Sequence, residues 1–259
     1  MDVKTEAGVF NVQIDGPEEA PWLVLSHSLG STLGMWASQV AAFTQRFRVL
    51  RYDTRGHGRS CVPPGEYSMA DLGSDVLGLL DALRAERVAF CGLSMGGATA
   101  LWLGTHARDR LTHVVVCNST PWFGPPETFA ERIEAVRKGG LGTLVDATME
   151  RWFTPAFRAE SPDVVARVRR EFLATPVDGY AGCLAALRDH DERAHLARID
   201  LPMLVIAGQY DVSPPPASAR AFATQLREAH FVELPAAHLS NLGAPEAFDE
   251  AVMGFLGSG

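Results

Sequence analysis

The sequence lacks any apolar run long enough to cross a bilayer. Strand-like apolar stretches such as residues 203–207 fall far short of the roughly 20 residues that a membrane-spanning helix requires. The first six residues, Met-Asp-Val-Lys-Thr-Glu, do not form a basic segment followed by an apolar one, so no secretory signal is predicted. We therefore expect a cytoplasmic protein that has no membrane partner.

Clustered positive charge is also missing. The chain of 259 residues carries 23 Lys and Arg against 31 Asp and Glu, which gives a formal net charge of −8, and it contains no Lys/Arg-rich run. Nucleic acids and anionic membranes are therefore not expected partners. If the substrate is an anion, local cations must bind it against an unfavourable overall field.

Cysteine is scarce and follows no pattern. The four cysteines, Cys61, Cys91, Cys117 and Cys183, form no C-x-x-C pair, and a chain of this length does not look like a disulfide-stapled fold. Cys91 and Cys117 lie in apolar runs, where a free thiol behaves as a small hydrophobic side chain. We expect free, buried thiols at these two positions.

What the chain does contain is an alternation of short apolar runs and amphipathic segments. Near-continuous Val, Ile and Leu runs are typical of strands covered on both faces, and they occupy residues 22–25, 47–52, 88–91, 113–117, 203–207 and 230–234. Helical spacing of apolar residues marks residues 33–43, 69–83, 97–106, 217–226 and 245–256. The alternation predicts an open, doubly wound, mostly parallel α/β sheet, and residues 3–14 add one or two edge strands.

Residues 121–196 break this rhythm. They resemble one helix after another, punctuated by proline and glycine, with no convincing strand. Sheets of this type bind ligands beyond the carboxyl ends of their strands. We therefore interpret 121–196 as a helical cap, or lid, inserted into a core formed by residues 1–120 and 197–259.

A candidate nucleophile lies in Gly92-Leu93-Ser94-Met95-Gly96, which fits the pattern G-x-S-x-G. The motif directly follows the apolar run 88–91 and directly precedes a helical segment, which is the context that exposes a serine hydroxyl at the top of a sheet. Side chains at 92 or 96 would collide with the neighbouring strand or helix. We predict that Ser94 is the nucleophile.

A serine hydroxyl needs a base, which in turn needs an orienting acid. His238 follows the last predicted strand and precedes the last helix, so it should lie at the same sheet edge as Ser94. Asp211 follows the strand at 203–207 and fits the order serine, acid, histidine. His106 and His230 are weaker candidates for the base because of their places in a helix and a strand, and Glu233 is the weaker candidate for the acid.

Two backbone amides should bind the oxygen that becomes negative in an acyl transfer. The residue after the nucleophile, Met95, is expected to supply one amide. Leu29, in the loop that follows the strand at 22–25, is expected to supply the other, and His27 is expected to shape that loop. The polar turn 53–60 lacks both the Walker and the dinucleotide glycine spacing, so we interpret it as structural.

Taken together, the motifs resemble those of the 3-oxoadipate enol-lactonases of the α/β-hydrolase superfamily. The resemblance covers nearly the whole chain and is carried by residues 26–36, 52–60, 92–97, 150–157, 179–183 and 237–242. The elbow and the segment 52–60 are shared by many α/β hydrolases, whereas the lid segments and the tail point to the lactonases. Two departures are His27, where these lactonases often carry Asn, and Phe129, where Trp would be unsurprising.

The resemblance implies an α/β-hydrolase fold and hydrolysis of a small carboxylated enol-lactone to 3-oxoadipate in the degradation of catechol and protocatechuate. It also implies an acyl-enzyme on Ser94 and no metal or organic cofactor. The substrate carboxylate should meet a lid cation among Arg132, Arg137, Lys138 and Arg151. We favour Arg132, with Trp152 as an apolar wall.

Two alternatives stay open at this stage. The same triad could serve another carboxylesterase, a C–C hydrolase or a perhydrolase, because one fold hosts many functions. A non-catalytic binding module on this scaffold is the second alternative, and the retained serine, acid and histidine argue against it. The sequence leaves open whether the chain forms a homo-oligomer.

Overall fold

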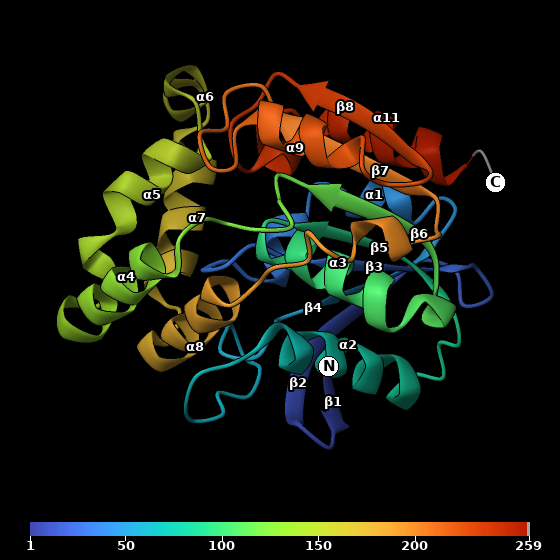
Figure 1. Ribbon diagram of the computed structural model, residues 1–259, viewed down its shortest axis with the longest axis horizontal. Helices are drawn as coiled ribbons and strands as arrows, with labels where there is room; N and C mark the ends of the chain where they lie inside the picture. The colour runs from blue at the N-terminus through green and yellow to red at the C-terminus, as the bar shows by residue number, and fades with distance from the viewer. Residues whose placement is uncertain (258–259) are drawn as a thin grey trace.

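An eight-stranded, mostly parallel sheet runs through the centre of the protein, in a computed structural model that describes residues 1–257 (Figure 1). The strand order is β1-β2-β4-β3-β5-β6-β7-β8. From β4 to β8 all neighbours are parallel, whereas β1 and β2 join one edge in antiparallel pairing. The strands are β1 (Asp2–Thr5), β2 (Gly8–Asp15), β3 (Trp22–Ser26), β4 (Arg48–Tyr52), β5 (Val88–Leu93), β6 (Leu111–Cys117), β7 (Met203–Gly208) and β8 (Ala229–Leu234).

Helices cover both faces of the sheet because successive strand residues point to opposite sides. Leu23 and Leu25 of β3 pack into one hydrophobic cluster together with α1 and α11, whereas Val24 packs into the other together with α2, α3 and α9. The core helices are α1 (Val40–Phe43), α2 (Met69–Ala82), α3 (Met95–His106), α9 (Pro216–Ala223), α10 (Ser240–Gly243) and α11 (Pro245–Leu256), with short 3-10 turns at Leu33–Trp36, Arg108–Arg110 and Leu196–Arg198.

The predicted α/β sheet is confirmed: all six predicted strands form, and two edge strands precede them at the N-terminus. The expectation that 230–234 is covered on both faces is wrong, because β8 is the last strand of the sheet and only its Leu234 is buried. The single helix expected over residues 33–43 is wrong. A 3-10 turn ends at Trp36 and the separate helix α1 begins at Val40. Between them the buried Gln39 donates to the Asn241 carbonyl oxygen (2.9 Å) and accepts a hydrogen bond from the Asn241 side chain (3.2 Å). These tertiary hydrogen bonds outweigh the local helical spacing.

Between β6 and β7 the chain leaves the sheet and forms a group of helices beyond the strand ends (Figure 1). These are α4 (Pro126–Gly139), α5 (Val145–Trp152), α6 (Pro155–Glu160), α7 (Pro162–Leu173) and α8 (Val177–Arg188), with a 3-10 turn at Leu141–Thr143. We call them the lid. Phe172 of α7 is fully buried there, with its ring edge-to-face against Trp152 of α5 and Tyr180 of α8. The lid therefore has its own aromatic packing and covers the carboxyl edge of the sheet.

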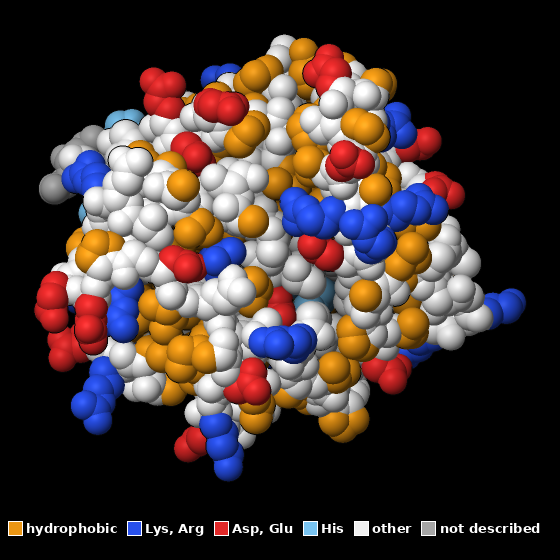
Figure 2. All heavy atoms as spheres, turned by 180° about the vertical axis from the view of Figure 1, so that it is seen from behind, with side chains coloured by type: hydrophobic (Ala, Val, Ile, Leu, Met, Phe, Trp, Pro, Cys, Tyr) orange, Lys and Arg blue, Asp and Glu red, His pale blue; other side chains and the backbone are white. Residues whose placement is uncertain are grey.

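The molecular surface mixes charges and small apolar groups. Figure 2 shows basic side chains in one short row beside a hollow, with acidic side chains spread around the face. Among residues 1–257, no helix is both long and apolar enough to span a membrane.

Candidate active site

Ser94 occupies the sharp turn between β5 and α3. Its backbone has φ 57° and ψ −111°, a left-handed conformation that is uncommon for a residue with a side chain. The neighbouring strand stabilises this strained turn, because the Ser94 N–H donates to the Cys117 carbonyl oxygen (2.8 Å) and the Ser119 hydroxyl donates to the Ser94 carbonyl oxygen (2.8 Å). Such strain persists only where the surroundings enforce it, and it commonly marks a functional position.

Close packing of the backbone requires glycine at both positions of the motif, Gly92 and Gly96. A Cβ atom on Gly92 would lie 2.0 Å from the carbonyl oxygen of Gly96 at the start of α3. A Cβ atom on Gly96 would lie 2.2 Å from the carbonyl oxygen of Ser26 at the end of β3. The predicted collisions with strand and helix are thus confirmed, and they explain how the turn brings Ser94 so close to the neighbouring backbone.

His238 and Asp211 meet at the carboxyl edge of the sheet. The distance between His238 Nδ1 and Asp211 Oδ2 is 2.8 Å, and both side chains are buried. Because an ionised carboxylate only accepts hydrogen bonds, His238 carries its proton on Nδ1 and leaves Nε2 able to accept one. Burial by itself would raise the pKa of Asp211, but the His238 charge and hydrogen bonds from His238, Asn118 and Ser213 outweigh it and hold the pKa below its ordinary value.

Asn118 is part of this arrangement and was missed by the sequence analysis. It follows β6 directly, adopts a left-handed backbone (φ 47°), and its Nδ2 donates to Asp211 Oδ2 (2.9 Å). Its own Oδ1 accepts a hydrogen bond from the Ser240 hydroxyl (2.5 Å). Its place at a parallel strand end, where site residues gather, was the only signal that could have found it.

The weaker candidates for base and acid lie elsewhere. His106, at the end of α3, stacks on Trp102 with 4.6 Å between ring centroids. His230 packs against Phe255, and Glu233 forms an ion pair with Arg220 on the surface. None of the three lines the cavity beside Ser94.

The two predicted amide donors flank Ser94. Met95 is the first residue of α3, where an N–H has no partner within its helix. Leu29 lines the same cavity as Ser94. Within residues 1–257, neither amide donates to a protein acceptor, so both stay available for an oxyanion.

Two buried imidazoles shape the loop that carries Leu29. The Thr54 N–H donates to His27 Nε2 (2.9 Å) and the Gly30 N–H donates to His57 Nε2 (2.8 Å). The opposite nitrogens contact the carbonyl oxygens of Ser28 and Arg55. Both rings are therefore neutral donors and acceptors that connect the loop after β3 to the turn after β4. Desolvation, together with the nearby His27, lowers the pKa of His57 to about 3.

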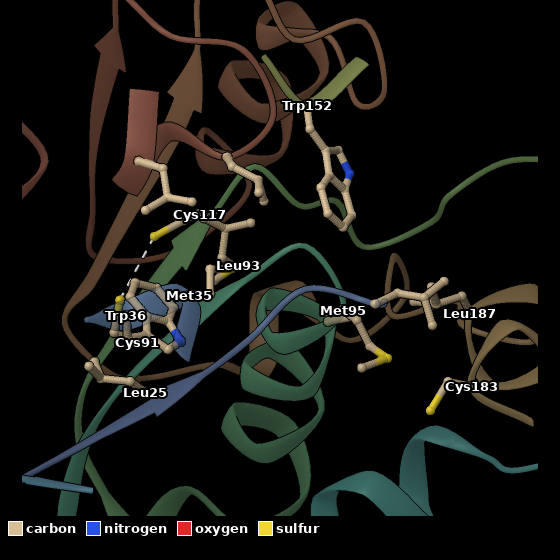
Figure 3. Close-up of a cluster of buried hydrophobic side chains, with 14 of the residues drawn as sticks. Leu25, Met35, Trp36, Cys91, Leu93, Met95, Cys117, Trp152, Cys183 and Leu187 are labelled. Atoms are coloured by element: carbon tan, nitrogen blue, oxygen red, sulfur yellow. Dashed lines mark hydrogen bonds between the residues drawn. The ribbon is translucent and has the colours of Figure 1, made fainter. Parts of the chain in front are cut away.

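A small cavity of about 60 Å³ lies between the lid and the strand ends. Ser94 and His238 line it from the core. From the lid it is lined by Arg132, Arg151 and Trp152, and further side chains at its wall are Ser28, Leu29, Phe123, Phe129, Leu187 and Ser213. Figure 3 shows Trp152 projecting from the lid toward Met95 and Leu187. The two residues predicted to bind substrate, Arg132 and Trp152, thus share one cavity with Ser94 and His238.

Arg151 was only one of four lid cations considered, and the structure places it in this cavity beside Arg132. Arg137 and Lys138 do not line it. Arg132 donates to the Tyr180 hydroxyl (2.5 Å) and lies over its ring. Within residues 1–257 no group of three or more His, Cys, Asp or Glu side chains is arranged to hold a metal ion.

Three of the four cysteines, Cys91, Cys117 and Cys183, are buried, and Cys61 is half-buried. Cys91 and Cys117 lie on neighbouring strands with their sulfur atoms 3.9 Å apart (Figure 3). They are free thiols within the hydrophobic core, as the sequence predicted. Burial, with the neighbouring Cys91, raises the pKa of Cys117, so the Cys117 thiol is not a reactive nucleophile.

A serine on a strand-to-helix elbow, a buried histidine–aspartate pair and a helical lid over a parallel sheet together define an α/β hydrolase. Residues 21–245 match the family described as α/β hydrolase fold. The 3-oxoadipate enol-lactonases 2 and 1 of Acinetobacter baylyi are 39% and 40% identical to this chain; the matches cover 94% and 100% of the chain and 91% and 97% of the relatives. The crystal structure of the enol-lactonase from Burkholderia xenovorans superposes with a TM-score of 0.98, at 42% identity and full coverage of both chains. The chain belongs to the α/β-hydrolase family, in the group of the 3-oxoadipate enol-lactonases, and it is a hydrolase.

Proposed function

We propose that the protein hydrolyses 3-oxoadipate enol-lactone to 3-oxoadipate in the degradation of aromatic compounds. The relatives that carry this activity in their names support the proposal through their similarity over the full chain. The observation that carries it is the cavity itself, in which Ser94 and His238 face two lid arginines. The two cations beside Ser94 and His238 suit an ester that bears a carboxylate.

The reaction begins at Ser94. His238 Nε2 takes the hydroxyl proton, and Ser94 Oγ forms a bond to the lactone carbonyl carbon. The amides of Leu29 and Met95 bind the resulting oxyanion, and Asp211 stabilises the imidazolium. The ring C–O bond then breaks, and His238 or solvent returns a proton to the enolate. Water activated by His238 finally releases 3-oxoadipate from Ser94, so this sequence of steps needs no metal or organic cofactor.

Arg132 is the proposed partner of the free carboxylate. Its guanidinium is held in place by the Tyr180 hydroxyl and ring, which leaves further N–H donors for a carboxylate. Trp152, which is buried and projects into the same cavity, supplies the apolar wall against which the lactone ring packs. The pocket combines one fixed cation with apolar surface, as small-molecule sites commonly do.

A substrate panel tests this proposal. We expect the purified protein to hydrolyse 3-oxoadipate enol-lactone, followed as loss of its ultraviolet absorbance, with a far higher kcat/KM than 4-nitrophenyl acetate and other simple aryl esters. A large preference for the aryl esters would overturn the lactonase proposal and favour a general carboxylesterase with the same triad. Spontaneous hydrolysis of the lactone without enzyme is the baseline.

A further inference from the structure

Arg151 is a cation beside the reacting groups, and its buried Nε lacks a hydrogen-bond partner within residues 1–257. It lies in the last turn of α5 and lines the cavity with Ser94 and His238. No carboxylate among residues 1–257 lies within 4.0 Å of its guanidinium. A buried donor left without a partner is costly, and it is retained here at the wall of the site.

Different contacts hold the two arginines at the cavity wall. Arg132 is attached to Tyr180 on α8. Arg151 instead precedes Trp152, whose carbonyl oxygen accepts a hydrogen bond from the N–H of Leu239, the residue after His238 (3.2 Å). This hydrogen bond ties the end of α5 to the loop that carries His238. The backbone beside Arg151 is therefore tied to the loop that carries His238, whereas the Arg132 guanidinium is held by Tyr180.

Arg132 and Arg151 line the same small cavity, so their positive charges repel each other. Burial, and next the charge of Arg132, lower the pKa of Arg151, although a guanidinium stays protonated. One substrate carboxylate neutralises only one of them. The cavity thus has a second positive charge that the ground-state substrate does not match, and groups matched only to a later state accelerate the chemical step.

The second negative charge arises when the ring opens. In 3-oxoadipate enol-lactone the carboxymethyl group is attached to the carbon that bears the ring oxygen. As the bond from Ser94 Oγ to the carbonyl carbon is completed and the ring C–O bond breaks, the electron pair stays on that oxygen as an enolate. The acyl-enzyme then carries both a carboxylate and an enolate, until the proton on His238 is transferred to the enolate and gives the ketone.

We propose that Arg151 is a catalytic residue that donates hydrogen bonds to the enolate oxygen as it leaves, while Arg132 binds the carboxylate. This inference rests on the proposed enol-lactonase function. It assigns the two cations to two anions on neighbouring parts of one molecule. It also distinguishes the lid of this enzyme from a passive cover, because one lid residue then takes part in bond breaking.

The test compares Arg151→Gln and Arg132→Gln on the enol-lactone. Loss of one donor to a developing oxyanion commonly lowers kcat by about 10²–10³-fold, and we expect a fall of that size for Arg151→Gln with a much smaller change in KM. Arg132→Gln should mainly raise KM. Arg151→Lys, which keeps the charge, should recover part of the lost kcat. Arg158→Gln removes a cation from α6, outside the cavity, and should behave as the parent.

The methyl ester of the substrate carboxyl group separates the two roles. It keeps the enol leaving group and lacks the carboxylate, so Arg132→Gln should turn it over as the parent does, whereas Arg151→Gln should still be impaired. The inference is overturned if the Arg151→Gln defect disappears on the methyl ester, or if its kcat on the enol-lactone equals that of the parent. A parent protein that does not hydrolyse the enol-lactone at all would instead overturn the proposed function.

Discussion

At the scale of single residues, buried polar groups fix the geometry of the site. His57 is completely buried, accepts a hydrogen bond from the Gly30 N–H and contacts the Arg55 carbonyl oxygen. It can do both only as a neutral imidazole. In the unfolded chain the same ring takes up a proton below about pH 6.5, so the two states bind different numbers of protons in mild acid.

This difference predicts a pH-dependent stability. Because the pKa of His57 is lowered to about 3 in the folded state, the unfolded state binds more protons as the pH falls from 6.5, and folding weakens. Between pH 7 and pH 5 the free energy of unfolding of the parent should fall by about 2 kcal/mol more than that of His57→Gln. Urea denaturation of both proteins at the two pH values measures this, and identical pH dependences would refute it.

Site residues that belong to a recognisable motif or follow a predicted strand in the expected order could be predicted from the sequence. Ser94, His238 and Asp211 each follow a strand in the expected order, and the structure brings His238 and Asp211 into contact. Asn118 and Arg151 escaped because nothing local distinguishes them. Asn118 acts through the position of a strand end beside Asp211. Arg151 was one of several lid cations, and only the fold of the lid shows that it lines the cavity whereas Arg137 and Lys138 do not.

At the scale of elements, the lid depends on its aromatic centre. Phe172 of α7 is fully buried, and its ring contacts Trp152 and Tyr180 with centroid distances of 5.7 and 5.6 Å. Tyr180 in turn holds Arg132. Phe172 thus contacts Trp152 and the tyrosine that holds Arg132, although it does not line the cavity itself.

Removal of that side chain should weaken the fold. Phe172→Ala should lower the free energy of unfolding by about 3–5 kcal/mol, since large-to-small changes in a core leave a cavity. Leu173→Ala, at the exposed next position of α7, should change it by no more than about 0.5 kcal/mol. Chemical denaturation of the two variants measures both. Equal stabilities would show that the aromatic centre does not support the lid.

Elements with strong periodicity were predictable from sequence, and elements set by tertiary contacts were not. The buried strands and the helix α2, whose start has the capping box of Ser68 and Asp71, follow from local pattern. The segment 33–43 carried a helical spacing but folds as two short pieces around Gln39. Its partner Asn241 lies about two hundred residues away, where no window of the sequence reveals it.

At the scale of the whole molecule, the positive charge at the site is opposite in sign to the net charge of the chain. The chain has a net charge of −8, yet two guanidinium groups line the small cavity beside Ser94 and His238. An overall negative field slows the approach of an anion, so the local cations must supply the attraction. This contrast between the global and the local charge fits a site for a small anionic substrate.

The Ser94→Ala variant tests whether Ser94 is the nucleophile of an enol-lactonase. Ser94→Ala should retain the fold by circular dichroism and lose turnover of 3-oxoadipate enol-lactone on the order of 10⁶-fold, as removal of a triad serine does elsewhere. The parent should hydrolyse the lactone rapidly under the same conditions. A Ser94→Ala protein whose kcat stays within about tenfold of the parent would show that Ser94 is not the nucleophile, because a triad without its serine keeps only a small residual catalysis.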